Sequence, residues 1–215
     1  YGEDNPALYT YTLTSGTLAD GESFSGALTR DPGESVGPYA IKKGTLTILD
    51  ALNNNVEDNY TVTFESDDFT ITTRPITIAV DNGQTKVYGD SDMLPYTFTL
   101  TSGTLATGDE FSGELSREPG EDVGSYLISK NTLTIIQTLG GGNKEINYDV
   151  TFEPADFTIT QRVLTVTANA GQTKTYGHAD PLPFTYSITD GNLVAWDAFD
   201  GALTRESGET IGDYT

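Results

Sequence analysis

The chain repeats one sequence unit, and this repetition limits its possible folds more than any other feature. A Tyr-Gly pair begins at Tyr1, Tyr88 and Tyr176, with intervals of 87 and 88 residues. Each pair is followed, at similar distances, by close variants of Phe-Ser-Gly-x-Leu-x-Arg and Gly-Glu-x-Val-Gly-x-Tyr. A unit of this kind that recurs in tandem is one supersecondary or domain-sized structure built several times.

The domain boundary is expected upstream of the Tyr-Gly pair. Residues 74–78 (Arg-Pro-Ile-Thr-Ile) match residues 162–166 (Arg-Val-Leu-Thr-Val), and both segments precede a Tyr-Gly pair. Since a domain should begin with its own first strand, we expect one complete repeat over residues 74–160. Residues 1–73 then form a repeat that lacks its first strand, and residues 161–215 form a repeat that lacks its last three.

The hydrophobic pattern predicts an all-β fold. Residues 132–136, 148–152 and 157–160 alternate apolar residues with polar ones, mostly Thr, as half-buried strands do. Turn-forming clusters such as Asp31-Pro32-Gly33 and Gly140-Gly141-Gly142 separate these segments. No segment has a long 3.6-residue apolar period, and the best helix candidate, residues 105–110, is expected to form at most one turn. We therefore expect small mixed or antiparallel sheets in every repeat.

The junctions between repeats are very short. The last expected strand of the first repeat, residues 68–72, and the first strand of the next, residues 74–78, leave almost no linker between them. A Gly/Ser spacer would give a flexible coil, whereas one or two residues restrict the angle between domains. An extended, fairly stiff rod is therefore expected.

Charge and composition exclude several classes of function. The net charge is -21, with 32 acidic and 11 basic residues, which argues against partners such as nucleic acid and anionic membranes. The chain has no cysteine, so disulfides and thiolate sites are excluded. It has no long apolar run for a membrane span and no signal peptide. Because it opens inside a motif, we expect it to be part of a longer chain that carries any targeting signal.

A catalytic function is not expected. A repeated domain should repeat its active site, but the only histidine, His178, aligns with Glu3 and Asp90 in the other repeats. A Ser-His-Asp arrangement therefore cannot recur. The single tryptophan, Trp196, is interpreted as a loop aromatic.

The acidic loops contain the only metal candidates. Calcium takes six to eight oxygen ligands, and none of the clusters has EF-hand spacing. No cofactor is expected beyond weak calcium binding, with these carboxylates as candidates: Asp90, Asp92, Asp109 and Glu110.

Two sets of repeated polar residues invite pairing. Arg30, Arg117 and Arg205 lie near Glu34, Glu121 and Glu209, which predicts one ion pair across a turn in each repeat. A covalent cross-link between a lysine and an asparagine is a further alternative, since both recur: Lys86 and Lys174, Asn59 and Asn147.

With the Tyr-Gly-x-x-Asp-Pro start and the Arg-x-Leu-Thr-Val segment added, these motifs resemble the MBG-type (YGX) repeats of large bacterial surface proteins and adhesins. The resemblance covers the whole chain. It implies small, mostly β, grasp-like domains in a secreted, cell-surface protein, and it supplies no catalytic residues.

The resulting functional hypothesis is a structural spacer or stalk in an extracellular adhesin-like protein of the bacterial cell surface. Its expected partners are neighbouring repeats of the same chain, with surface glycans or proteins bound through other domains. Two alternatives stay open: a glycan- or protein-binding repeat module, and a subunit of a self-assembling extracellular filament with strand exchange.

Overall fold

The computed structural model describes residues 1–215 and is all-β, as predicted. It contains sixteen strands, and the only helical elements are two short 3-10 turns, η1 (Glu57–Asn59) and η2 (Glu145–Asn147). None of its helices could cross a bilayer, because each is too short for the apolar span required.

The residues form two compact units, and the division between them runs through the middle repeat. The first unit contains Tyr1–Asp81, Pro95–Ser116 and Ile128–Ala155. The second contains Asn82–Leu94, Arg117–Leu127 and Asp156–Thr215. Each unit therefore includes one of the two junctions between repeats.

In the first unit, the middle repeat is organised around β6 (Arg74–Val80). This strand lies between β13 (Tyr148–Glu153) and β8 (Phe98–Ser102) in a three-stranded sheet. It runs parallel to β13 and antiparallel to β8. Alternate residues of a strand face opposite sides of the sheet, and the side chains of Ile76, Ile78 and Val80 are buried.

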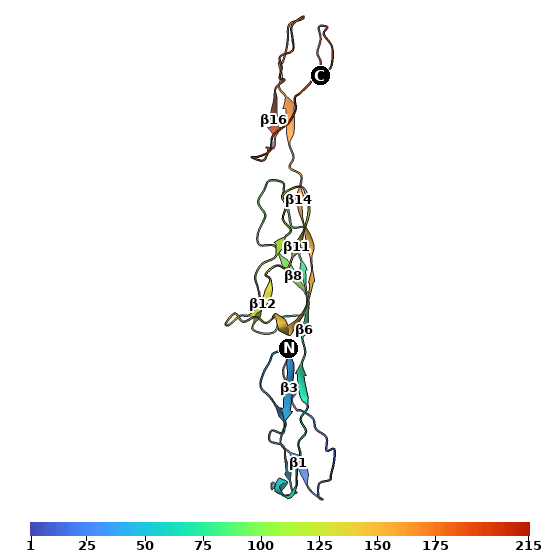
Figure 1. Ribbon diagram of the computed structural model, residues 1–215, viewed down its shortest axis with the longest axis vertical. Helices are drawn as coiled ribbons and strands as arrows, with labels where there is room; N and C mark the ends of the chain where they lie inside the picture. The colour runs from blue at the N-terminus through green and yellow to red at the C-terminus, as the bar shows by residue number, and fades with distance from the viewer. The chain divides into compact units, whose positions relative to one another are not determined.

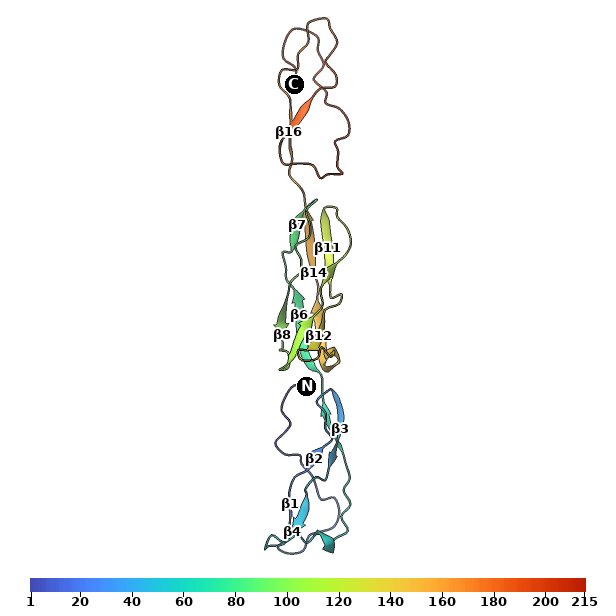
Figure 2. The same ribbon diagram turned by 90° about the vertical axis from the view of Figure 1, so that its left-hand side faces the viewer.

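The other strands of the middle repeat complete its core. The sheet order is β10 (Ser116–Arg117), β11 (Gly124–Ser129), β14 (Ala155–Thr160) and β7 (Thr85–Val87). Figure 2 shows β7, β11 and β14 side by side. β14 is parallel to β7 and buries Phe157 and Ile159 completely.

A two-stranded sheet pairs β9 (Asp109–Ser112) with β12 (Thr134–Gln137). The prediction of a helical turn at residues 105–110 was wrong. A tight turn at Thr107-Gly108 leads directly into β9, and pairing with β12 holds that segment extended.

The first repeat contains five strands. They are β1 (Ser23–Ser25), β2 (Thr29–Arg30), β3 (Gly37–Lys42), β4 (Thr47–Leu49) and β5 (Asp68–Ile71). The strand predicted at residues 60–64 is not formed. In the middle repeat its counterpart, β13, pairs only with β6, and no residues of the first repeat correspond to β6.

The third repeat contains β15 (Thr165–Ala168) and β16 (Tyr186–Asp190), which form an antiparallel pair. Residues 199–205 and 208–214, which match residues 111–117 and 120–126 of the middle repeat, form no strands. Their counterparts in the middle repeat pair with β12 and β14, which have no equivalents among residues 161–215.

The repeat boundaries at residues 74 and 160 stay a prediction, although every strand from β6 to β14 pairs only within these limits.

Candidate functional site

The first repeated site is an arginine cluster inside each repeat. In the middle repeat the guanidinium of Arg117, at the end of β10, contacts Asp92 with a 2.8 Å ion pair from Nε to Oδ2. It also pairs with Glu121 over 2.7 Å and donates to the carbonyl oxygens of Glu118 and Gly120. The side chain of Arg117 is only 7% exposed. The expected Arg–Glu ion pair is therefore present, within a larger network.

Lys86 completes this network from β7. Its side chain is only 3% exposed, and its ammonium lies 2.8 Å from Oδ1 of Asp92 and also pairs with Glu121. Burial alone would lower the pKa of Lys86, but hydrogen bonds to Asp92 and Glu121 outweigh it and raise the pKa. Hydrogen bonds from Lys86 and Arg117 lower the pKa of Glu121. Lys86 and Glu121 are therefore both charged at neutral pH.

Arg117 also fixes the aromatic core. Its guanidinium carbon lies 5.1 Å from the ring centre of Tyr126 and 5.2 Å from that of Phe157. Cation–π contacts of this kind favour Arg, because a planar guanidinium can stack and donate in-plane hydrogen bonds at once. The ion network is thereby coupled to β14, which carries Phe157.

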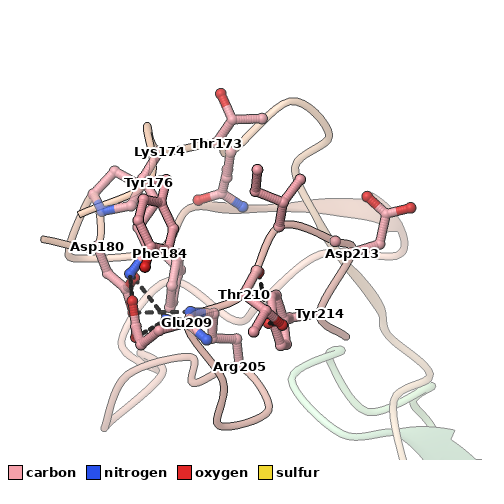
Figure 3. Close-up of a pocket in the computed structure, with 14 residues that line it drawn as sticks. Thr173, Lys174, Tyr176, Asp180, Phe184, Arg205, Glu209, Thr210, Asp213 and Tyr214 are labelled. Carbon is pink, nitrogen blue, oxygen red and sulfur yellow. Dashed lines mark hydrogen bonds and ion pairs between the residues drawn. The ribbon is translucent and has the colours of Figure 1, made fainter. Parts of the chain in front are cut away.

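The third repeat has the same cluster. Figure 3 shows Lys174, Asp180, Arg205 and Glu209 facing one another. Arg205 pairs with Asp180 and Glu209, each at 2.9 Å. Hydrogen bonds from Arg205 and Lys174 lower the pKa of Asp180 to about 2.

The first repeat has a reduced version. Arg30 pairs with Glu34 over 2.7 Å, and Asn5 accepts its hydrogen bonds where the other repeats have an aspartate. The ring of Tyr39 lies 4.9 Å from the guanidinium carbon.

A cavity of about 290 Å³ adjoins the cluster of the third repeat, and Lys174, Arg205 and Tyr214 are among its lining residues (Figure 3). In the middle repeat, Phe157 of β14 occupies the place beside the corresponding arginine. The cavity therefore lies where the middle repeat has a core strand, and we do not interpret it as a small-molecule site.

The second repeated site lies where one repeat meets the next, and the Tyr-Gly pair forms half of it. At the first junction the hydroxyl of Tyr1 donates a 2.9 Å hydrogen bond to Oδ2 of Asp109. The same oxygen accepts a 2.7 Å hydrogen bond from Tyr148. Burial, followed by the bond to Asp109, raises the pKa of Tyr1. Its hydroxyl is therefore a donor at neutral pH.

The glycine of the pair packs where no side chain fits. Gly2 has a φ of +75°, and a Cβ placed on it would lie 2.5 Å from the Cβ of Ala106. Glycine is the residue suited to both a left-handed backbone and a close approach. The two members of the Tyr-Gly pair thus contribute different things, a hydrogen bond and close packing.

Arg74 at the start of β6 supplies the other half of the junction. It donates to the carbonyl oxygens of Tyr1 over 3.0 Å and Thr104 over 2.8 Å, and it pairs with Glu3 over 2.6 Å. Figure 1 shows the chain start lying next to the beginning of β6. One arginine therefore connects the Tyr-Gly loop of one repeat to two segments of the next.

The second junction repeats these contacts. Tyr88 donates to Asp197 over 3.2 Å, and Arg162 donates to the carbonyl oxygen of Tyr88 over 2.8 Å and pairs with Asp90. A Cβ on Gly89 would lie 2.3 Å from Cγ2 of Val194. Because the two junctions lie in different units, their agreement indicates that the motif itself encodes the site. We call these contacts the junction site. One repeat contributes its Tyr-Gly pair and the acidic residue that follows it, Glu3 or Asp90. The next repeat contributes an arginine (Arg74 or Arg162), a small apolar residue (Ala106 or Val194) and an aspartate (Asp109 or Asp197).

The metal candidates are not brought together. Asp90 pairs with Arg162, Asp92 with Lys86 and Arg117, and Asp109 accepts from two tyrosines. Glu110 is exposed on β9. No group of three or more His, Cys, Asp or Glu side chains is arranged to hold a metal ion. Weak calcium binding at Asp90, Asp92, Asp109 and Glu110 stays a prediction.

The proposed lysine–asparagine partners have other contacts. Asn147, only 1% exposed, accepts a 2.9 Å hydrogen bond from the backbone N–H of Val36, across the first junction. Lys86 belongs to the other unit and contacts carboxylates. Lys174 pairs with Asp180 and Glu209. These contacts give the cross-link alternative no support.

The one histidine and the one tryptophan of the chain lie at the surface. His178 and Trp196 are exposed. Sequence reasoning missed Asp92 and Asp180 as arginine partners, and it also missed the role of the Tyr-Gly pair. One signal was available: the few cations of so acidic a chain recur at fixed positions and require carboxylate partners.

A family model described as "MBG domain (YGX type)" matches residues 1–70, 76–158 and 164–215. These matches coincide with the three repeats. Neither the curated proteins nor the solved structures gave a match to this chain.

Proposed function

Since the chain belongs to the MBG domain family of the YGX type, in three tandem copies, we propose that it is a structural spacer, a stalk segment of an adhesin-like protein on the bacterial cell surface. In this role it carries out no catalysis. Its repeats set the distance between other parts of the protein, and each repeat's main partner is its neighbour.

The junction site is the observation that carries this proposal. A spacer must keep its domains in a defined relation, and a short linker restricts this relation without fixing it. The junction site adds side-chain hydrogen bonds, an ion pair and close packing at both junctions. Repeats held by nearest-neighbour contacts of this kind behave as a quasi-one-dimensional array.

The charge and the internal ion clusters suit the exposed surface location that we propose. A net charge of -21 favours solubility, and buried ion clusters and core packing stabilise a chain that has no cysteine for disulfides. The arginine cluster of the middle repeat connects two loops to β7 and β10, a cross-linking role that disulfides have in other small domains.

A filament subunit with strand exchange is the second candidate. A cavity of about 350 Å³ in the first repeat is lined by residues 10–14 and 62–65, together with Leu28 and Leu46. These two segments correspond to β8 and β13, the neighbours of β6 in the middle repeat. If residues 162–168 of a second copy left their pairing with β16 and entered this position, the copies would join in an open-ended assembly.

Small-angle X-ray scattering on the 215-residue chain tests the stalk proposal. Two successive strands span about 40 Å per repeat at about 3.3 Å per residue, so a stiff array should have a radius of gyration of about 30 Å or more. A compact chain of this length would give about 17 Å, and that result would contradict the proposal. A molar mass that rises with concentration would favour the filament instead.

A further inference from the structure

We propose that each complete repeat is a load-bearing element, in which tension along the chain shears a pair of parallel strands. This inference rests on the proposed stalk function, because a stalk transmits force from one end of the chain to the other. It adds to that function a specific mechanical property and the strands that provide it.

The first and last parts of the middle repeat are paired in parallel. β6 pairs with β13 over six residue pairs, from Tyr148↔Arg74 to Glu153↔Ala79. β7 pairs with β14 over three more, from Thr158↔Thr85 to Thr160↔Val87. The amino-terminal strands of the repeat are thus hydrogen-bonded directly to its carboxyl-terminal strands.

The chain connectivity determines how tension acts on these pairs. Tension from the preceding repeat enters at Arg74 and pulls β6 toward its beginning. Tension toward the following repeat leaves at Thr160 and pulls β14, and β13 through Pro154, toward their ends. Because the paired strands are parallel, these pulls are opposed along a common direction.

Opposed pulls on parallel strands load the ladder in shear. In a parallel pair the inter-strand hydrogen bonds are evenly spaced and slanted, and a pull along the strands loads all of them at once, so they share the load and must break together. An antiparallel hairpin pulled from its two ends would open one bond at a time. The strands β9 and β12 come between these terminal strands in the sequence and pair with each other, so tension does not pass directly through them.

Side chains strengthen the same strands. Ile76 and Ile78 of β6 are 2% and 1% exposed, and sliding β6 past β13 would remove both from the core. On β14, Phe157 is held against Arg117, and the hydroxyl of Thr160 donates to the carbonyl oxygen of Lys86. Shear must therefore break packing and polar contacts together with the ladder.

Single-molecule force spectroscopy on the whole chain, tethered at its two ends, tests this inference. The middle repeat should unfold in one discrete step that releases at most about 310 Å of extended chain for 87 residues. The first repeat has no counterpart of β6, and the third none of β13 or β14. Both should therefore extend at lower force. Extension of the middle repeat at the same low force, or without a discrete step, would overturn the inference.

Matched variants locate the resistance. Ile76→Val removes one methylene from β6, and Ile135→Val removes one from β12, where Ile135 is equally buried. At constant force we expect Ile76→Val to speed unfolding of the middle repeat about two- to tenfold. Ile135→Val should speed it less, because Ile135 packs near Ile78 and Val150 but lies on a strand outside the loaded ladder. Ile78→Val serves as a second variant on the loaded strand. Equal effects of the β6 and β12 variants would overturn the inference.

The two proposals fail separately. A compact particle in scattering would contradict the stalk, whereas a resistant, β6-dependent unfolding step would still establish the shear-loaded pair. If the particle is elongated but its middle repeat unfolds at low force, the stalk proposal stands and the load-bearing proposal is refuted.

Discussion

A fragment of residues 74–160 is expected to fold as a stable monomer, whereas a fragment of residues 88–174, equal in length, should be unfolded or should dimerise by strand exchange. The second fragment lacks β6 and β7 and carries their counterparts at its other end. β6 buries Ile76, Ile78 and Val80. At about 1.5–3 kcal/mol for each buried side chain, their loss approaches the total stability of a small domain, about 5–15 kcal/mol.

The misplaced strand cannot return within the same fragment. The start of β6 pairs with Tyr148, which lies twelve residues before the end of β14 at Thr160. The two residues that follow Thr160 reach at most about 7 Å, so residues 162–168 cannot occupy the position of β6. Urea denaturation at matched concentrations, with molar mass by light scattering, measures the difference. A monomeric 88–174 fragment as stable as 74–160 would show that the boundary is wrong.

The substitution Arg117→Met is expected to lower the free energy of unfolding of the middle repeat by about 3–5 kcal/mol, as loss of one partner from a buried ion pair does. Asp92 would lose its contacts with Arg117, the carbonyl oxygens of Glu118 and Gly120 would lose this donor, and the stack on Phe157 would disappear. Met keeps the apolar volume, so the effect reports mainly the charge and the hydrogen bonds.

Glu121→Gln is the matched control, because Glu121 contacts the same cations but is mostly exposed. Exposed ion pairs contribute about 0.2–1 kcal/mol, so this variant should remain close to the unaltered chain. Chemical denaturation measures both effects. If Arg117→Met and Glu121→Gln destabilised the chain equally, the buried contacts of the cluster would not be its main contribution to stability.

The pH profile identifies the electrostatic part of this effect. The pKa of Glu121 is lowered in the folded state, and the pKa of Asp180 in the equivalent cluster is about 2. A lowered carboxyl pKa adds stability that is fully present above the unfolded pKa, about 4, and is lost as the pH falls through the folded pKa. The stability difference between the unaltered chain and Arg117→Met should therefore narrow as the pH falls below about 4.

The sequence alone predicted the elements that depend on local pattern. Alternation of Thr with Ile or Val indicated β6, β12 and β14, and Arg117 and Glu121 are close enough in sequence for their ion pair to be expected. Alternation shows which face of a strand is buried but not which strand lies beside it. The parallel pairing of β6 with β13, which joins residues more than seventy positions apart, therefore could not be predicted.

The candidate sites were predicted less completely for the same reason. Asp92 approaches Arg117 from 25 residues upstream. Asp109 is a calcium candidate by sequence, whereas in the structure it accepts hydrogen bonds from Tyr1 and Tyr148. The segment at residues 60–64 shows the converse. It matches the predicted strand at residues 148–152, but without a partner strand its backbone groups have no ladder to join.

The central claim is that the junction site holds adjacent repeats in a fixed relation, and Gly89→Ala tests it against a matched control. Alanine at Gly89 would bring a Cβ within 2.3 Å of Val194, whereas at Gly177, with a φ of +80° against +83°, nothing lies within 4 Å. Both substitutions carry the same left-handed backbone cost of about 1–2 kcal/mol. Only Gly89→Ala should also disrupt the junction.

The most direct measurement is the distance distribution between two spin labels placed across the second junction. The chain has no cysteine, so exposed Ser125 and Ala168 can be replaced by Cys and labelled without background. Pulsed electron resonance should give one narrow distribution for the otherwise unaltered chain and for Gly177→Ala, and a broad one for Gly89→Ala. A broad distribution in the unaltered chain, or a narrow one in Gly89→Ala, would contradict the account.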